Sequence, residues 1–107
     1  MADTLKRYTT TGVTNSANTL YTAGSGVTAT MLSISLCNIH ATTDVLFDLK
    51  VMDGGSTEYY LYRDQSLPAQ ATFIHNGKLT LKATDTLVAL TNVGATVDVY
   101  ISVLEQT

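Results

Sequence analysis

Aliphatic and polar residues alternate near the end of the chain, over residues 96–104. The odd positions of this stretch are all aliphatic: Val97, Val99, Ile101 and Val103. The even positions include polar residues such as Asp98 and Ser102. Side chains of an extended chain alternate between two sides, and β-branched residues suit a half-buried pleated surface. The stretch is therefore predicted to be a strand with one buried face.

Similar short segments, separated by turn residues, recur along the whole chain. The predicted strands cover residues 5–11, 19–22, 27–39, 44–52, 57–63, 71–75, 78–82, 86–91 and 96–104. Threonine, which favours strands, is abundant, and no segment has a helical pattern. We expect an all-β fold, namely a single antiparallel β-sandwich that is jelly-roll-like and has about eight strands.

Turn residues predict how neighbouring strands connect. The Asp-Gly-Gly-Ser turn at 53–56, the Asn76-Gly77 pair and the turn at 92–95 each predict a hairpin. Pro68 cannot donate a hydrogen bond to a sheet ladder. A longer crossing connection is therefore expected over residues 63–70.

Alternation also predicts which side chains share a face of the sheet. Leu32 is expected on the same face as Ile34. Tyr60 is expected to share a face with Tyr62, and Tyr59 to lie on the opposite one.

Length and charge narrow the class of protein. A chain of 107 residues is expected to form one domain, residues 1–107. Its formal net charge is -3 and its basic residues are scattered, whereas nucleic-acid binding needs a clustered basic face. No stretch reaches the roughly 18 consecutive apolar residues of a membrane span, and the N-terminus lacks the apolar region of a secretory signal. We expect neither nucleic acid nor membrane as a partner, and synthesis in a cytoplasm.

Cys37 is the single cysteine, so neither an intrachain disulfide nor an all-cysteine metal cage can form. We interpret it as a small apolar strand residue. A nucleophilic cysteine would need a base, and alternation places His40 on the opposite face. His75 remains open as a neighbour that the fold could bring close.

Neither the acidic residues nor the sequence motifs predict a metal site or a catalytic site. Asp44, Asp48 and Asp53 fall in one predicted hairpin, but without the D-x-D-x-D-G spacing of a calcium loop. We interpret them as solvated residues of a strand face. The sequence contains no Gly-x-Ser-x-Gly elbow, Walker loop or metal-spaced histidine pair. We therefore expect no metal, no cofactor and no enzymatic activity.

An aromatic and basic cluster is formed by Tyr59, Tyr60, Tyr62 and Arg63. Aromatic platforms bind sugars and stack on bases, and Tyr and Arg are favoured at protein interfaces. With no tryptophan and no flanking carboxylate pair, the sugar interpretation is the weaker one. Tyrosines packed under a loop or against a neighbouring subunit are favoured.

The order of several short motifs resembles small virion structural proteins of tailed bacteriophages, especially marine ones. The similar segments read LKRYTTTGVTNSANTLYTAG, LCNIHATTDVLFDLKV, STEYYLYRDQSLPAQATFIHNGKLTLKATDTLVA and VDVYISVLEQT. The shared features are a strand ending in Asn38, a Tyr-rich strand at Tyr59 and Tyr60, Pro68-Ala69, residues 77–79, the alternating run 79–85 and residues 103–105. Members of the group commonly have Pro near position 23, where this chain has Ala23 followed by Gly24.

The resemblance implies a building block of a phage particle. A capsid decoration (cement) protein, which binds and stabilises the assembled head, is the leading hypothesis, with the major capsid protein as its partner. A tail, fibre or collar component involved in attachment to a host receptor is the alternative. The resemblance also implies a homo-oligomer in the virion, for which a trimer would suit, while a dimer or a monomer stays open.

Two groups of residues are expected at interfaces: Leu5, Lys6, Arg7 and Tyr8, and Tyr59, Tyr60, Tyr62 and Arg63. The first group belongs to a possible N-terminal arm, residues 1–11. A terminal strand with Lys6 and Arg7 can lie on an acidic surface or extend the edge of a sheet. A plain edge strand is the competing interpretation.

Overall fold

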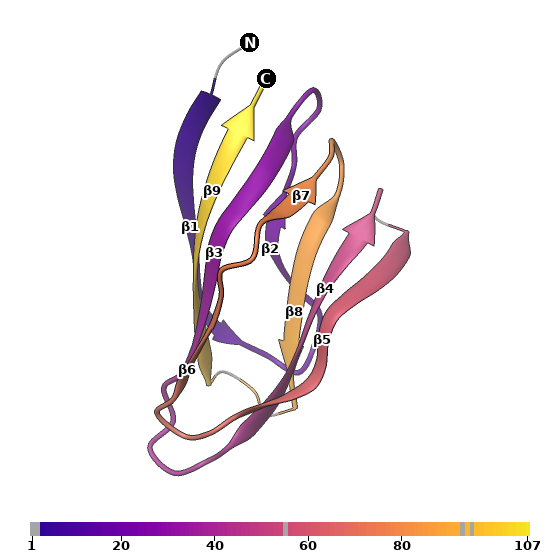
Figure 1. Ribbon diagram of the computed structural model, residues 1–107. Helices are drawn as coiled ribbons and strands as arrows, with labels where there is room; N and C mark the ends of the chain where they lie inside the picture. The colour runs from indigo at the N-terminus through magenta and orange to yellow at the C-terminus, as the bar shows by residue number, and fades with distance from the viewer. Residues whose placement is uncertain (1–2, 55, 93, 95) are drawn as a thin grey trace.

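Two antiparallel sheets face each other and enclose a single apolar core (Figure 1). The structure is a computed structural model, and it describes residues 3–54, 56–92, 94 and 96–107. The strands are β1 (Asp3–Val13), β2 (Asn18–Thr22), β3 (Thr28–Asn38), β4 (Val45–Asp53), β5 (Thr57–Leu67), β6 (Thr72–His75), β7 (Leu79–Leu81), β8 (Thr86–Thr91) and β9 (Val97–Gln106).

The order of the strands is that of a jelly roll. One sheet has the order β1-β9-β3-β6, with β7 also pairing with β3, and the other has the order β2-β8-β4-β5. β6 pairs with residues 34–37 of β3 and β7 with residues 29–31, so the two occupy successive parts of one strand position. The nine described strands therefore fill the eight positions of two Greek keys. The predicted all-β, jelly-roll-like sandwich is confirmed.

Of the three predicted hairpins, one is confirmed. β4 and β5 pair antiparallel on either side of the turn, and the Ser56 amide donates to the Asp53 carbonyl at 3.1 Å. The predicted pairing of the last two strands is wrong, because β8 pairs with β2 and β4 while β9 pairs with β1 and β3. Positions 93 and 95 of that turn lie outside the described residues. The Asn76-Gly77 hairpin is also wrong, since β6 and β7 both pair with β3.

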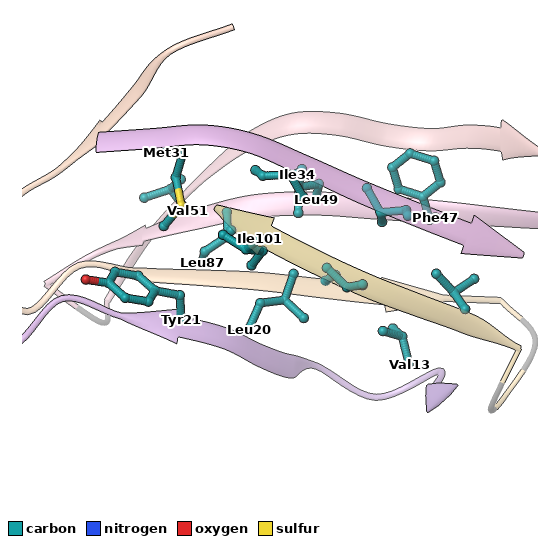
Figure 2. Close-up of a cluster of buried hydrophobic side chains, with 14 of the residues drawn as sticks. Val13, Leu20, Tyr21, Met31, Ile34, Phe47, Leu49, Val51, Leu87 and Ile101 are labelled. Carbon is teal, nitrogen blue, oxygen red and sulfur yellow. The ribbon is translucent and has the colours of Figure 1, made fainter. Parts of the chain in front are cut away.

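The core is made by the inward-facing side chains of both sheets. Figure 2 shows Ile34 and Ile101 of one sheet packed against Leu49 and Leu87 of the other, and all four are fully buried. Burying an aliphatic side chain of this size contributes about 1.5–3 kcal/mol relative to leaving it in water. The predicted buried face of β9 is therefore its core face.

A bulge in β3 corrects one predicted face. The register with β9 shifts between Met31 and Ser33, so Leu32 is the extra residue. Met31 and Ile34 are fully buried, whereas Leu32 is only partly buried. An inserted residue reverses the alternation, and Leu32 therefore does not share the buried face of Ile34.

The end of β3 is fixed by the buried side chain of Asn38. Its amide nitrogen donates to the carbonyl oxygens of Thr43, at 2.8 Å, and Leu67, at 3.0 Å. Its side-chain oxygen accepts from the His40 amide at 3.0 Å. One asparagine thus joins the β3–β4 connection to the end of β5.

Candidate interaction surfaces

The predicted N-terminal arm is an edge strand over its described residues. Residues 3–10 of β1 pair in continuous antiparallel register with β9, from Asp3 opposite Gln106 to Thr10 opposite Val99. Leu5 is 72% exposed, and Arg7 is exposed on the same outward face. Lys6 and Tyr8 point the other way, toward Glu105. The first predicted group is thus divided between the two faces of β1.

Glu105 is the centre of a polar network at one end of the sandwich. It is 8% exposed, and its carboxylate accepts hydrogen bonds from the hydroxyls of Tyr21 and Tyr8, the latter at 3.3 Å. The Lys6 ammonium lies 3.0 Å from the other carboxylate oxygen. The rings of Tyr8 and Tyr21 meet edge to face with their centroids 4.9 Å apart. Because Tyr21 belongs to β2, the network joins the two sheets.

The partners of Glu105 set its ionisation. The hydrogen bond from Tyr21, helped by Lys6, holds the pKa of the Glu105 carboxyl below its ordinary value of 4.5 against the opposing effect of burial. Burial and the hydrogen bond to Glu105 raise the pKa of the Tyr21 hydroxyl. The hydrogen bond to Glu105 likewise raises the pKa of Lys6. The network is therefore a carboxylate held by neutral phenols and one ammonium.

Glu105 was missed by sequence analysis. Its signal was its position, two residues after Val103 on the odd-numbered, buried face of β9. A carboxylate that continues an apolar stripe needs partners once it is buried. Tyr21 and Tyr8, which supply them, lie far away in the sequence.

The second predicted group lies on β5, the edge strand of the other sheet. Tyr59 is 57% exposed and Tyr60 39% exposed, and Arg63 is also exposed. Tyr62 instead points inward and packs edge to face on Phe73, with ring centroids 4.8 Å apart. The expectation that Tyr60 and Tyr62 share a face is therefore wrong.

Two irregularities in β5 cause this difference. Leu49 pairs with Tyr62 and the next residue, Lys50, pairs with Tyr60, so Leu61 is an extra residue. A second shift follows around Asp64, which has a φ of 51° and whose amide donates to Asp48 at 2.7 Å. Each bulge re-aims the side chains next to it.

Tyr60 lies between two cations on the outer face of its sheet. The Arg63 guanidinium carbon is 5.0 Å from the centre of the Tyr60 ring, and the Lys50 ammonium is 5.5 Å from it. Lys50 also forms an ion pair with Glu58, and that hydrogen bond raises its pKa. Tyr59 pairs with Val51 and therefore points to the opposite face, as predicted. We call Tyr60 and Arg63, together with the exposed Tyr59 beside them on the same edge strand, the tyrosine–arginine surface. Cation–π contacts hold the Tyr60 ring and the Arg63 guanidinium in place.

The fold keeps the two predicted groups apart. β1 lies beside β2, at the end of the four-stranded sheet that is remote from β5. Figure 1 shows β1 and β5 at opposite edges of the molecule. The structure therefore has two separate candidate surfaces, and each belongs to an edge strand.

The other candidates of the sequence have local structural partners. Asp44 accepts from the Ala69 amide at 2.9 Å, and Asp48 from that of Asp64. The His75 ring pairs with the Tyr62 hydroxyl at 2.8 Å on the inner side of β6, while Cys37 faces outward. Within residues 3–54, 56–92, 94 and 96–107, no three His, Cys, Asp or Glu side chains are grouped closely enough to hold a metal ion. The same residues include no helix long and apolar enough to cross a membrane.

No family model matches the chain, and no curated protein sequence is similar to it. Two solved structures share its fold over almost its whole length. One, from work on Bacillus endospore appendages that form a family of disulfide-linked pili, has a TM-score of 0.60 at 14% identity and covers 98% of this chain and 88% of its own. The other, from the acid-stable capsid of Helicobacter pylori bacteriophage KHP30, has a TM-score of 0.58 at 17% identity and covers 98% of this chain and 87% of its own. At these identities the likeness establishes the fold.

Proposed function

We propose that this chain is a structural, non-enzymatic protein of a phage particle, and within it a capsid decoration protein that binds and stabilises the assembled head. The observation that carries the proposal is the jelly roll shared with a phage capsid structure over 98% of this chain. The sequence resemblance to small phage virion proteins supports it independently. Its place is then the virion, after synthesis in the host cytoplasm.

The mechanism proposed is preferential binding. A protein that binds the assembled shell of major capsid protein better than the free subunits stabilises the shell by linkage. Such binding needs exposed and ordered contact residues more than a cleft. A small sandwich with two separate edge surfaces fits this requirement.

We assign the shell contact first to the tyrosine–arginine surface. Tyr59 and Tyr60 expose large rings, and Tyr60 is held between Lys50 and Arg63. Ordered Tyr and Arg side chains lose little entropy on binding and are frequent in the centres of interfaces. The N-terminal strand, with Leu5 exposed and Lys6 next to it, is the second proposed contact.

The first test is the copy number and location of the chain in purified particles, by quantitative gel electrophoresis and electron microscopy. Many copies spread over the head are expected. A few copies at the tail would transfer the proposal to a tail, fibre or collar component in contact with a host receptor. This tail, fibre or collar component is the second candidate, because a structure of pilus-forming endospore appendages has the same fold. Absence from particles would overturn both.

Matched variants then locate the contact on heads that lack the protein. Tyr60→Ser combined with Arg63→Ser is expected to abolish binding, while Leu5→Ser on the opposite edge should weaken it less. The reverse order would assign the contact to the N-terminal strand. Substitutions are preferable to deleting residues 1–8, because deletion removes most of β1 together with the Lys6 and Tyr8 partners of Glu105.

A further inference from the structure

Rows of side chains cross the outer face of the five-stranded sheet, and three successive rows lie around Tyr100. The strand registers define them as Arg7, Ser102 and Ser33; Thr9, Tyr100, Ser35 and Ile74; and Asp98, Cys37 and Thr72. We call the second set the middle row. Its residues alternate with buried core residues such as Val99 and Ile34, so they point away from the core. Ile74 is 59% exposed and Tyr100 45% exposed, which gives the middle row two uncovered apolar groups.

The charges on this face are few and regularly placed. The charged residues of these three rows are Arg7 and Asp98, and Asp3, opposite Gln106 at the start of β1, is a further charge on the same face. The outer side of the other sheet differs, since it carries the Lys50–Glu58 ion pair and Arg63. A nearly uncharged sheet face can be covered by another surface at low desolvation cost.

Arg7 and Asp98 lie on opposite sides of the middle row. Arg7 comes two residues before Thr9 on β1, and Asp98 two residues before Tyr100 on β9. Because Thr9 and Tyr100 are antiparallel partners, the two charges are displaced in opposite directions, each by about 7 Å. A two-fold axis along the middle row exchanges the row of Arg7 with that of Asp98. Face-to-face packing of two copies would therefore place each Arg7 over the Asp98 row of its partner.

The carboxylate of Asp98 has room for such a partner. The Thr11 hydroxyl, at 2.7 Å, and the Gly12 amide, at 3.2 Å, both donate to its Oδ1 atom. A carboxylate offers about four acceptor sites on its two oxygens. These bonds fix the position of Asp98 beside β1 and leave Oδ2 to receive a guanidinium.

The face also has a hollow beside the exposed Tyr100 ring. A hollow of about 390 Å³ next to Tyr100 is lined by residues of β1, β3 and β9, among them Thr9, Ser35, Cys37 and Asp98. The exposed Tyr100 ring and the hollow thus adjoin each other at the middle row. Isologous contacts use one patch twice, so Tyr100 of each copy can enter the hollow of the other.

We propose that this face binds a second copy of the chain, in a two-fold dimer centred on the middle row. The inference does not depend on the proposed function, because it concerns the isolated protein. Of the trimer, dimer and monomer that the sequence left open, it specifies a dimer that forms through one face of the sheet.

Sedimentation equilibrium of the purified chain tests the proposal. The natural chain is expected to dimerise, and Arg7→Glu or Asp98→Arg should each raise the dimer dissociation constant by about tenfold or more. The double variant Arg7→Glu/Asp98→Arg should restore dimerisation, which a purely structural effect of either change would not produce. Tyr59→Lys, exposed on the other sheet, should leave the dissociation constant unchanged and serves as the control.

Cross-linking tests the position of the axis. Ser35 lies in the middle row, and facing sheets lie about 10 Å apart, which is too far for a direct disulfide. A short bismaleimide should therefore link Ser35→Cys between the two copies in a Cys37→Ser background. The natural Cys37 residues would lie about 14 Å apart along the strands and should not link. A monomer at all concentrations, or a dimer that persists without change in both single charge variants, would overturn the proposal. If the protein is a monomer and its Tyr100→Lys variant no longer binds phage heads, the proposal is also overturned, and this face is the contact with the shell.

Discussion

The Tyr21 hydroxyl of β2 donates a hydrogen bond to the Glu105 carboxylate of β9, so a side chain of one sheet is bonded to a buried charge in the other. Apolar packing between two sheets has little directional preference. A single hydrogen bond of this kind has a fixed geometry. It defines how β1 and β9 lie against β2 at this end of the sandwich.

We expect Tyr21→Phe to lower the free energy of unfolding by about 1–3 kcal/mol, because a buried carboxylate loses a donor while the packing of the ring is kept. Urea unfolding followed by circular dichroism measures the change. Tyr59→Phe removes a hydroxyl from a ring that is 57% exposed, and it should change stability by less than about 0.5 kcal/mol. Equal effects of the two substitutions would show that the bond to Glu105 contributes nothing.

Stability should fall with acid in a way that depends on Glu105. The folded-state pKa of this carboxyl lies below its ordinary value of 4.5, so the unfolded chain takes up a proton first. Its contribution is present above pH 4.5 and is lost as the pH falls through the folded-state pKa. The unfolding midpoint should therefore decrease on acidification below that value.

Glu105→Gln should flatten this acid dependence without removing it. Asp85 is a second such carboxyl. Burial disfavours its charged form, but hydrogen bonds from the Gly54 amide and from Lys82 outweigh burial and lower its pKa. It contributes with the same sign. Urea midpoints of the natural chain and the variant, compared between neutral and acidic pH, check the difference. Parallel pH profiles would contradict the role of Glu105.

Asn38→Asp should destabilise the protein more than Asn38→Ala does. The alanine variant leaves the carbonyls of Thr43 and Leu67 without their donor, at a cost of about 1–3 kcal/mol. The aspartate variant places an acceptor, and a charge, against the same two carbonyls. Chemical denaturation of both variants ranks them, and an aspartate variant as stable as the alanine one would refute this account.

Gly26→Ala should destabilise the protein, whereas Gly24→Ala should not. Gly26 has a φ of 75° with no atom within 4 Å of an added Cβ, so the cost is backbone strain of about 1–2 kcal/mol. At Gly24 an added Cβ would make an ordinary contact of 3.6 Å with Val27, and alanine there should be neutral or slightly stabilising. Thermal unfolding of the two variants distinguishes them, and similar melting temperatures would contradict the strain at Gly26.

The local pattern of the sequence predicted the strands well, because apolar and polar residues alternate along a strand as its buried and exposed positions do. Val97, Val99 and Ile101 are buried as their alternation indicates. The pairing of the strands was harder to predict from the sequence. A strand with one apolar face looks the same whether its successor lies beside it in one sheet or across the core in the other. β8 and β9 are of the second kind, which is why a hairpin was wrongly expected there.

The candidate surfaces were predictable in part, for similar reasons. The exposure of Leu5 and Tyr59 follows from their edge strands, but edge strands are known only from the complete topology. The inward turn of Tyr62 depends on the extra residue Leu61, and a bulge has no reliable mark in the sequence. The partners of Glu105 are likewise set by contacts between distant segments.

The two bulges of β5 also limit how copies of this protein can join edge to edge. A further strand needs a regular ladder of free amides and carbonyls, and bulges interrupt and twist such a ladder. β1 keeps an even register from Asp3 to Thr10, whereas β5 does not. Among the other edges, β2 shifts register between Thr19 and Tyr21, and the far edge of the β1 sheet is divided between the short strands β6 and β7. Within the described residues, β1 is therefore the one long regular edge. Growth by strand addition is self-limiting, which favours assemblies of finite size over open-ended fibrils.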